Sequence, residues 1–165
     1  MSFLKMFTCY KAWANELIFS TIESLPEGEA TKERPTRFKN MVHTLNHAYV
    51  IGCIFRVHVE GKQHHHTAAR NTPTHLPPHK LWKSVKIIDQ WYIDYAISLS
   101  EQQLSECIKF QFVGGGEGIM SLRDMMLHVI NHGTYHRGFV GDMMYQVPVV
   151  PPATDLPVFL HNVWR

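Results

Sequence analysis

The sequence predicts an all-α protein, a four-helix bundle with a short β-like hairpin before its last long helix. Four segments repeat apolar residues at spacings of three and four, which is the period of an amphipathic helix. Proline and glycine residues separate these segments, and a stretch of β-like alternation with a Gly-rich turn precedes the last one. The chain has 165 residues, the usual size of one domain, so we expect a single domain over residues 1–165.

The first two helices are expected at residues 3–25 and 36–60. Pro26 follows the first helix, Pro35 precedes the second, and Gly61 lies just past its end. The second helix carries two apolar stripes on roughly opposite sides. The first stripe consists of Phe38, Val42, Leu45, Tyr49 and Gly52, and the second of His43, His47, Val50 and Ile54. A helix that is apolar on two sides is expected to be covered on both, by the bundle interior and by a further helix or a second subunit.

A loop rich in His, Thr and Pro is expected at residues 61–79, followed by a third helix at residues 80–100. Three prolines disfavour a helix in the loop. The loop contains the triplet His64, His65 and His66. Adjacent histidines in such a loop are typical of a solvated surface, so we expect no metal site there.

The hairpin is expected within CIKFQFVGGGEGIM, and the fourth helix at residues 121–146, with Ser121 as N-cap and Asp124 three residues later. GGGEG is not a phosphate-binding loop, because no GK[ST] follows it. Three glycines lie inside the fourth helix, each at a cost of about 1 kcal/mol relative to alanine. They predict close approach of a neighbouring segment, such as the helix of Gly52. The Pro-rich tail ends in apolar residues and is expected to pack along the bundle surface.

Composition excludes several classes of protein. A formal net charge of +2 without a basic stripe argues against nucleic-acid binding. Polar residues interrupt every apolar stretch before the roughly 18 residues that a membrane span requires. No export signal is visible at the N-terminus, so we expect a cytoplasmic protein. Cys9, Cys53 and Cys107 are widely separated, and we expect reduced, mostly buried thiols.

Five histidines recur at helical spacing and form a candidate metal site. His43 and His47 lie four residues apart in the second helix, and His128, His132 and His136 recur at every fourth position in the fourth. Residues four apart share one helix face, and neutral imidazole is a good ligand for zinc, nickel, iron and copper. Such pairs also arise by chance. The spacing alone therefore leaves two alternatives open: these histidines form a metal site, or they are ordinary surface or core residues.

Two short motifs and both ends of the chain are similar to a known family. The motifs are NH at Asn46–His47 and NHGTYHRG at Asn131–Gly138, with YKAWANELI near the start and DLPVFL near the end. In these motifs and their order the sequence resembles the DinB/YfiT-like family of damage-inducible proteins over nearly its full length. The resemblance implies an antiparallel four-helix bundle that is often a homodimer.

The resemblance also implies a metal ion bound by His47, His132 and His136, with His43 and His128 as neighbours of the site. Two residues depart from the family pattern, since Tyr135 stands where many members have another His, and Phe139 where a Gln often follows HRG. Both change the polar surroundings of the site, so substrate specificity does not carry over.

Three neutral imidazoles would leave a divalent transition metal ion, zinc or nickel, with open coordination positions. Such an ion lowers the pKa of bound water towards about 7 or binds a thiol as thiolate. We therefore expect a metal-dependent hydrolase or thiol S-transferase, the latter like some relatives, acting on a small-molecule substrate with a low-molecular-weight thiol. Tyr135, Asp124 and Asp142 are candidate general bases, and Arg137 either forms a salt bridge in the bundle or meets an anionic substrate.

The alternative is a metal-binding structural or stress-response protein without turnover. It would need a closed metal shell, with a fourth protein ligand such as His43 or His128.

Overall fold

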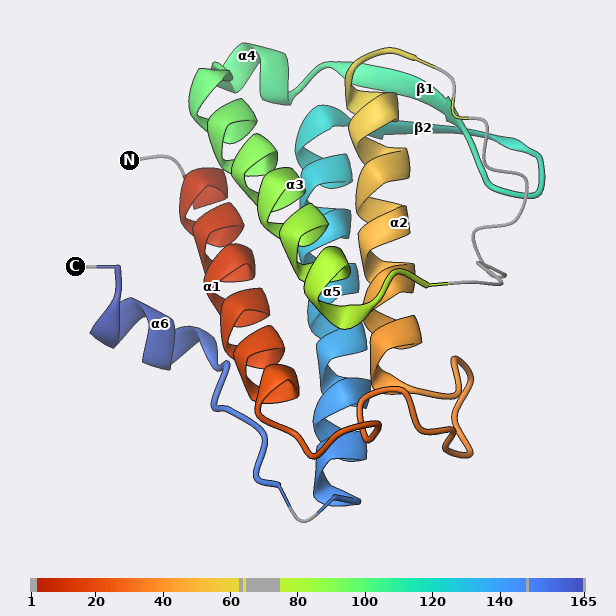
Figure 1. Ribbon diagram of the computed structural model, residues 1–165. Coiled ribbons are helices and arrows are strands. Elements are labelled where there is room, and N and C mark those ends of the chain that lie inside the picture. The colour runs from red at the N-terminus through yellow and green to blue at the C-terminus, as the bar shows by residue number, and fades with distance from the viewer. Residues whose placement is uncertain (1–2, 63, 65–74, 148, 165) are drawn as a thin grey trace.

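The computed structural model describes residues 3–62, 64, 75–147 and 149–164. It confirms the prediction of an all-α fold with a short antiparallel hairpin before the last long helix (Figure 1). In chain order the elements are α1 (Phe3–Glu23), α2 (Met41–Val59), α3 (Pro78–Ser98), α4 (Glu101–Leu104), β1 (Cys107–Gln111), β2 (Glu117–Ser121), α5 (Leu122–Tyr145) and α6 (Leu156–Asn162). The short helices α4 and α6 were not predicted, because segments of this length show too little periodicity.

Helices α1 and α5 run in one direction and α2 and α3 in the other (Figure 1). The pairs α1/α3 and α2/α5 therefore pack antiparallel, and α2 and α3 run parallel, so one long connection joins opposite ends of the bundle. Two hydrogen bonds tie the parallel pair together. The Tyr92 hydroxyl donates to the Gly52 carbonyl at 2.8 Å, and the Tyr95 hydroxyl donates to the Val59 carbonyl at 3.2 Å.

Helix α2 begins at Met41, later than the predicted residue 36. Asn40 is its N-cap, because the Asn40 side-chain oxygen accepts a hydrogen bond from the His43 backbone N–H at 2.7 Å. Lys39 has a φ of 64°, in the left-handed region, and this conformation interrupts any helix before Asn40. Phe38 is therefore a loop residue and not part of a helical stripe.

Both sides of α2 are covered within this chain. Val42 and Leu45 of the first stripe lie in the bundle core. Val50 and Ile54 of the second stripe are also buried, and Val113 from the turn of the hairpin packs against them. The second stripe thus has a partner inside the chain, and the homodimer stays a prediction.

The hairpin leads directly into α5. Its strands pair in register from Cys107 opposite Ser121 to Gln111 opposite Glu117. The Ser121 side chain accepts a hydrogen bond from the Asp124 backbone N–H at 3.1 Å, which confirms the predicted N-cap. This cap defines the start of the helix that carries His132 and His136.

The glycines of α5 have neighbours other than the predicted one. A side chain at Gly133 would approach the Arg137 guanidinium to 3.2 Å and the Lys11 side chain of α1 to 3.7 Å. At Gly141 it would contact the ring of Pro151, and at Gly138 nothing lies within 4 Å. The predicted close approach of a neighbouring segment is confirmed at Gly133 and Gly141, but the neighbours are Lys11 and Pro151 and not the helix of Gly52.

The C-terminal segment packs on α1, as predicted. Phe159 of α6 is buried, and its ring lies 5.7 Å from the ring of Tyr10 and 5.4 Å from that of Trp13. These contacts hold the tail on the side of α1 that faces away from the histidine-bearing helices (Figure 1).

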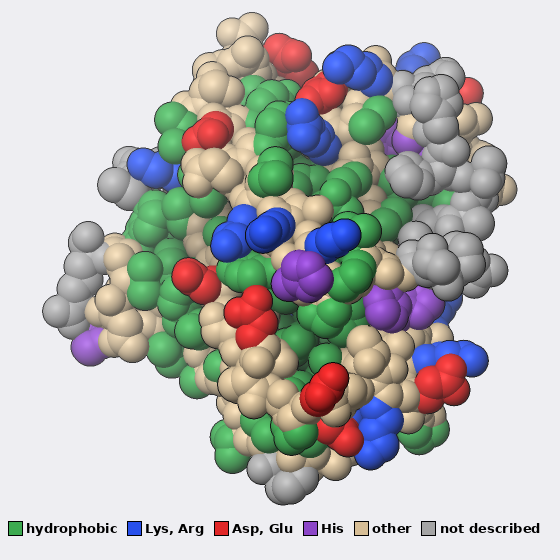
Figure 2. All heavy atoms as spheres, in the orientation of Figure 1, with side chains coloured by type: hydrophobic (Ala, Val, Ile, Leu, Met, Phe, Trp, Pro, Cys, Tyr) green, Lys and Arg blue, Asp and Glu red, His purple; other side chains and the backbone are tan. Residues whose placement is uncertain are grey.

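Charges of both signs are mixed on the face of the molecule shown in Figure 2. A small group of Lys and Arg side chains near its centre lies close to Asp and Glu side chains, and hydrophobic side chains lie between them. Across the described part of the chain, no helix combines the length and the hydropathy that crossing a bilayer would require.

Candidate metal centre

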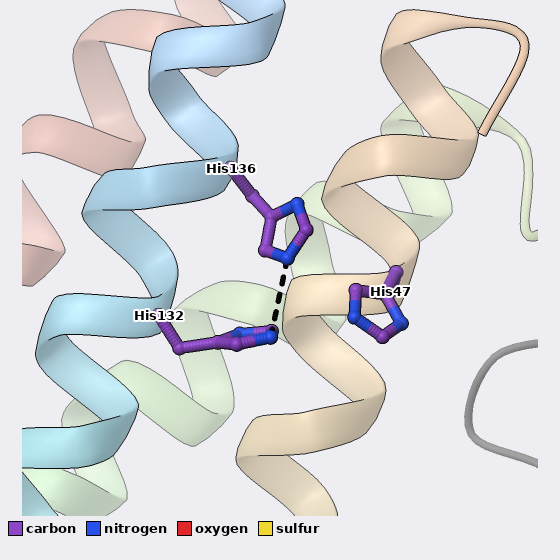
Figure 3. A group of neighbouring side chains, drawn as sticks. All are labelled: His47, His132 and His136. Carbon is purple, nitrogen blue, oxygen red and sulfur yellow. Dashed lines mark hydrogen bonds between the residues drawn. The ribbon is translucent and has the colours of Figure 1, made fainter. Parts of the chain in front are cut away.

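His47, His132 and His136 come together between two antiparallel helices. His132 and His136 extend from successive turns of α5, and His47 faces them from α2 (Figure 3). One ligand nitrogen from each ring lies within 4.8 Å of the other two. The Nε2 atoms of His132 and His136 are 3.1 Å apart, and the ring centre of His47 lies 5.1 Å from that of His132 and 4.7 Å from that of His136.

Phe38 supports this arrangement from the loop before α2. Its ring stacks on His47 at 4.4 Å between ring centres with an interplanar angle of 21°. The same ring meets the edge of His136 at 5.5 Å. Because the Asn40 cap and the left-handed Lys39 turn the loop back over α2, Phe38 restricts the orientation of His47.

His43 and His128 lie outside the cluster, as the family resemblance implied. Among the described residues, only His47, His132 and His136 form a group whose spacing suits a shared ion. The His128 ring lies 4.5 Å from the ring of Phe55 and 5.5 Å from that of His132. The His43 ring lies between Phe38, at 5.7 Å, and His75, at 5.9 Å.

The cluster favours uncharged imidazoles. Burial, with smaller contributions from the nearby rings of His136, His47 and His128, lowers the pKa of His132 from 6.5 to about 3. Burial and the charges of His47 and Arg37 lower the pKa of His136 to about 4. Both rings are therefore neutral at pH 7 and each has a lone pair available for a metal ion.

The donor set fits a divalent transition metal ion. Two imidazole nitrogens that bind one tetrahedral ion at about 2.05 Å lie about 3.3 Å apart, close to the 3.1 Å between His132 Nε2 and His136 Nε2. Within the described residues, the buried Nδ1 atoms of these two histidines have no hydrogen-bond partner.

The three rings line a pocket with a volume of about 240 Å³. The lining residues are Thr36, Arg37, Phe38, His47, His132, Tyr135, His136 and Phe139. None of these lining residues is a carboxylate. The pocket thus offers space beside the histidines, walls that are largely aromatic, and a single permanent positive charge.

The other residues singled out in the sequence have mixed outcomes. Tyr135 lines the pocket. Asp124 accepts a hydrogen bond from the Ser121 hydroxyl at 2.6 Å in the α5 cap, and Asp142 is exposed near the end of α5. Arg137 is buried and donates to Asn15 at 3.0 Å and to Thr134 at 2.9 Å, so its role is inside the bundle.

The cysteines do not line this pocket. All three are free thiols, as predicted, but the prediction that they are mostly buried was wrong for Cys107, which is exposed. Burial raises the pKa of the Cys9 and Cys53 thiols, which disfavours the reactive thiolate.

Most of the predicted His-rich loop, including His65 and His66, lies outside the described residues. The described His64 places Nε2 3.0 Å from the Gln111 carbonyl oxygen, and its ring lies 5.0 Å from that of His58.

Sequence reasoning missed the contribution of the loop before α2. Thr36 and Arg37 line the pocket, and Phe38 positions His47, whereas the prediction had placed all three in a helix. One signal was present, since Asn directly before the apolar run from Met41 is a typical N-cap. That signal gives the start of α2 but not the path by which the loop returns to the histidines.

The fold and the site define a class of protein, a helical bundle with a three-histidine cluster that could hold a metal ion beside a pocket. The chain belongs to the DinB family, whose sequence profile matches residues 1–164. It is similar to Protein DinB of Bacillus subtilis (strain 168), with 26% identity over 156 residues that cover 92% of this chain and 90% of that protein.

Proposed function

We propose that this protein is a metal-dependent enzyme in which His47, His132 and His136 hold one divalent transition metal ion, zinc or nickel. The observation that carries the proposal is the opening of the three-histidine cluster into a pocket. Catalytic zinc sites commonly have three protein ligands and an open position, whereas structural sites are closed by a fourth. Here the space beside the three rings is a pocket of about 240 Å³ and not a further ligand.

The chemistry supplied by such an ion is Lewis-acid activation of a water molecule or a thiol. Around it, Phe38 orients His47, and Phe38, Tyr135 and Phe139 form the aromatic walls of the pocket. Hydrolysis usually needs a positioned general base, and the pocket lining contains no carboxylate. A thiol is far more acidic than water, so a metal-bound thiol would release its proton to solvent without such a residue. Transfer of a low-molecular-weight thiol to an electrophile that carries a leaving group is therefore favoured over hydrolysis.

A non-catalytic metal-binding protein has less support. It would need a fourth ligand such as His128 or His43, and in the described residues both rings lie outside the group that suits a shared ion. The His128 ring packs against Phe55 instead.

Metal analysis of the protein, purified without a His-tag or a nickel column, tests the site. We expect about one transition metal ion per chain. The variants His47→Ala, His132→Ala and His136→Ala should lose it, because each removes one of only three ligands. His128→Ala and His43→Ala are the matched controls on the same helices, and they should retain the ion. Metal retained in the ligand variants, or lost in the controls, would contradict the assignment.

Turnover is a separate measurement on the same protein. The metal-loaded protein should consume a low-molecular-weight thiol together with a soluble electrophile, and the metal-free His132→Ala variant should not. Full metal occupancy without turnover across a panel of thiols, electrophiles and esters would favour the non-catalytic alternative.

A further inference from the structure

The pocket beside the histidine cluster has an asymmetric lining. Its single permanent charge is that of Arg37, and no acidic residue lines it. Arg37 is exposed, its guanidinium carbon lies 5.7 Å from the centre of the Phe38 ring, and among the described residues no carboxylate pairs with it. An unpaired guanidinium beside an aromatic wall is suited to bind a carboxylate through two parallel hydrogen bonds.

The walls of the same pocket are aromatic and face solvent. Tyr135 and Phe139 lie one turn apart on α5 with ring centres 4.9 Å apart and an interplanar angle of 84°. They remain 62% and 40% exposed, although most large hydrophobic side chains of the bundle are buried. The pair thus offers a flat ligand both a ring face and a ring edge to pack against.

The pocket is also small. Pockets for drug-sized ligands usually have volumes of about 300–1,000 Å³, and this pocket has about 240 Å³. It therefore suits a ligand with about one ring and one short polar group.

We propose that this pocket binds a single-ring aromatic carboxylate, with its carboxylate on Arg37 and its ring against Phe38, Tyr135 and Phe139. This inference rests on the proposed function, because the pocket is the one into which the proposed metal centre opens. Binding does not require turnover and can be measured separately.

Three probes on the metal-loaded protein separate the features of the ligand. Benzoate carries both the ring and the charge, benzamide lacks the charge, and acetate lacks the ring. We expect benzoate to bind at least about tenfold more tightly than either of the others by calorimetry, because one charge-assisted contact or one stacked ring is each worth about a factor of ten. Equal affinities for benzoate and benzamide would overturn the role of Arg37, and equal affinities for benzoate and acetate would overturn the role of the walls.

Variants then locate the two contacts. Arg37→Gln should weaken benzoate binding about tenfold, with partial recovery in Arg37→Lys, because lysine keeps the charge but not the planar fork. Arg123→Gln is the matched control, since Arg123 is exposed and pairs with Glu101 at 2.7 Å away from the pocket, and it should leave the affinity unchanged. Tyr135→Ala should weaken benzoate and leave acetate unaffected.

Benzoate could also bind directly to the metal ion, and two results distinguish this. If it binds to the ion, Arg37→Gln leaves the affinity for benzoate unchanged and the metal-free His132→Ala variant no longer binds benzoate. These two results would overturn the proposal. If Arg37 holds the carboxylate, Arg37→Gln weakens binding and His132→Ala retains it. Metal content is determined on the same samples, so a protein that binds metal but not benzoate refutes only this inference, and a protein without metal refutes the proposed function.

Discussion

Replacement of Asp89 with alanine is expected to lower the free energy of unfolding by about 3–5 kcal/mol, because it leaves two buried cations without their carboxylate. Asp89 is 4% exposed on α3. One carboxylate oxygen pairs with Lys11 of α1, and the other accepts a hydrogen bond from the Asn15 amide at 2.8 Å. The Asn15 oxygen in turn accepts from Arg137 of α5 at 3.0 Å.

This network joins three helices at the centre of the bundle. Lys11 and Arg137 are 7% and 3% exposed, and among the described residues Asp89 is the one carboxylate in contact with this group. The rings of Tyr92 and Tyr10 lie 5.7 Å and 5.8 Å from the two cationic groups and stabilise them in part. Arg137 follows His136 directly in α5, so the network also supports the turn of the helix that carries the metal centre.

Urea denaturation of the metal-free protein measures the effect of Asp89→Ala. Asp94→Ala is the control on the same helix, because Asp94 is exposed and accepts one hydrogen bond from Gln90, and its effect should be within about 0.5 kcal/mol. Asp89→Asn keeps the shape and removes only the charge, and it should also be strongly destabilising. If both Asp89 variants lowered the free energy of unfolding by less than about 1 kcal/mol, burial of Lys11 and Arg137 would not depend on this carboxylate.

The metal-free protein is expected to lose about 3–5 kcal/mol of stability between pH 6.5 and pH 4.5, because His132 and His136 are held neutral in the folded state. Their pKa values fall to about 3 and about 4, whereas the ordinary value in an unfolded chain is 6.5. Below pH 6.5 the unfolded state therefore binds more protons than the folded state. Stability is complete above pH 6.5, falls by about 1.4 kcal/mol per pH unit for each histidine as the pH drops, and levels off below the folded pKa values.

Urea midpoints measured from pH 7.5 to pH 4.5 test this dependence. In the variant His132→Asn the stability should fall less steeply with decreasing pH than in the wild type, because one of the two contributing rings is absent. In His128→Asn the dependence on pH should stay closer to that of the wild type. Excess zinc should move the fall to lower pH, because the ion binds the neutral rings of the folded state. Parallel curves for the wild type and His132→Asn would contradict the assignment of the slope to the cluster.

Several features of the site follow from local rules. The spacing of His132 and His136 puts both rings on one face of any helix, and the Ser121 cap and the apolar periodicity mark that helix in the sequence. The distinction of His47 from His43 came from the family resemblance and not from spacing, since both lie in the same helix and on the same apolar stripe.

Helical periodicity was thus sufficient to establish the class of fold and the paired histidines of α5, because both depend on contacts within one or two turns of backbone. The approach of α2, the return of the Arg37–Phe38 loop over the site, and the burial of Lys11 with Asp89 depend on tertiary packing. These contacts join residues far apart in the chain, and their geometry is set by how four helices share one core, which no local spacing encodes.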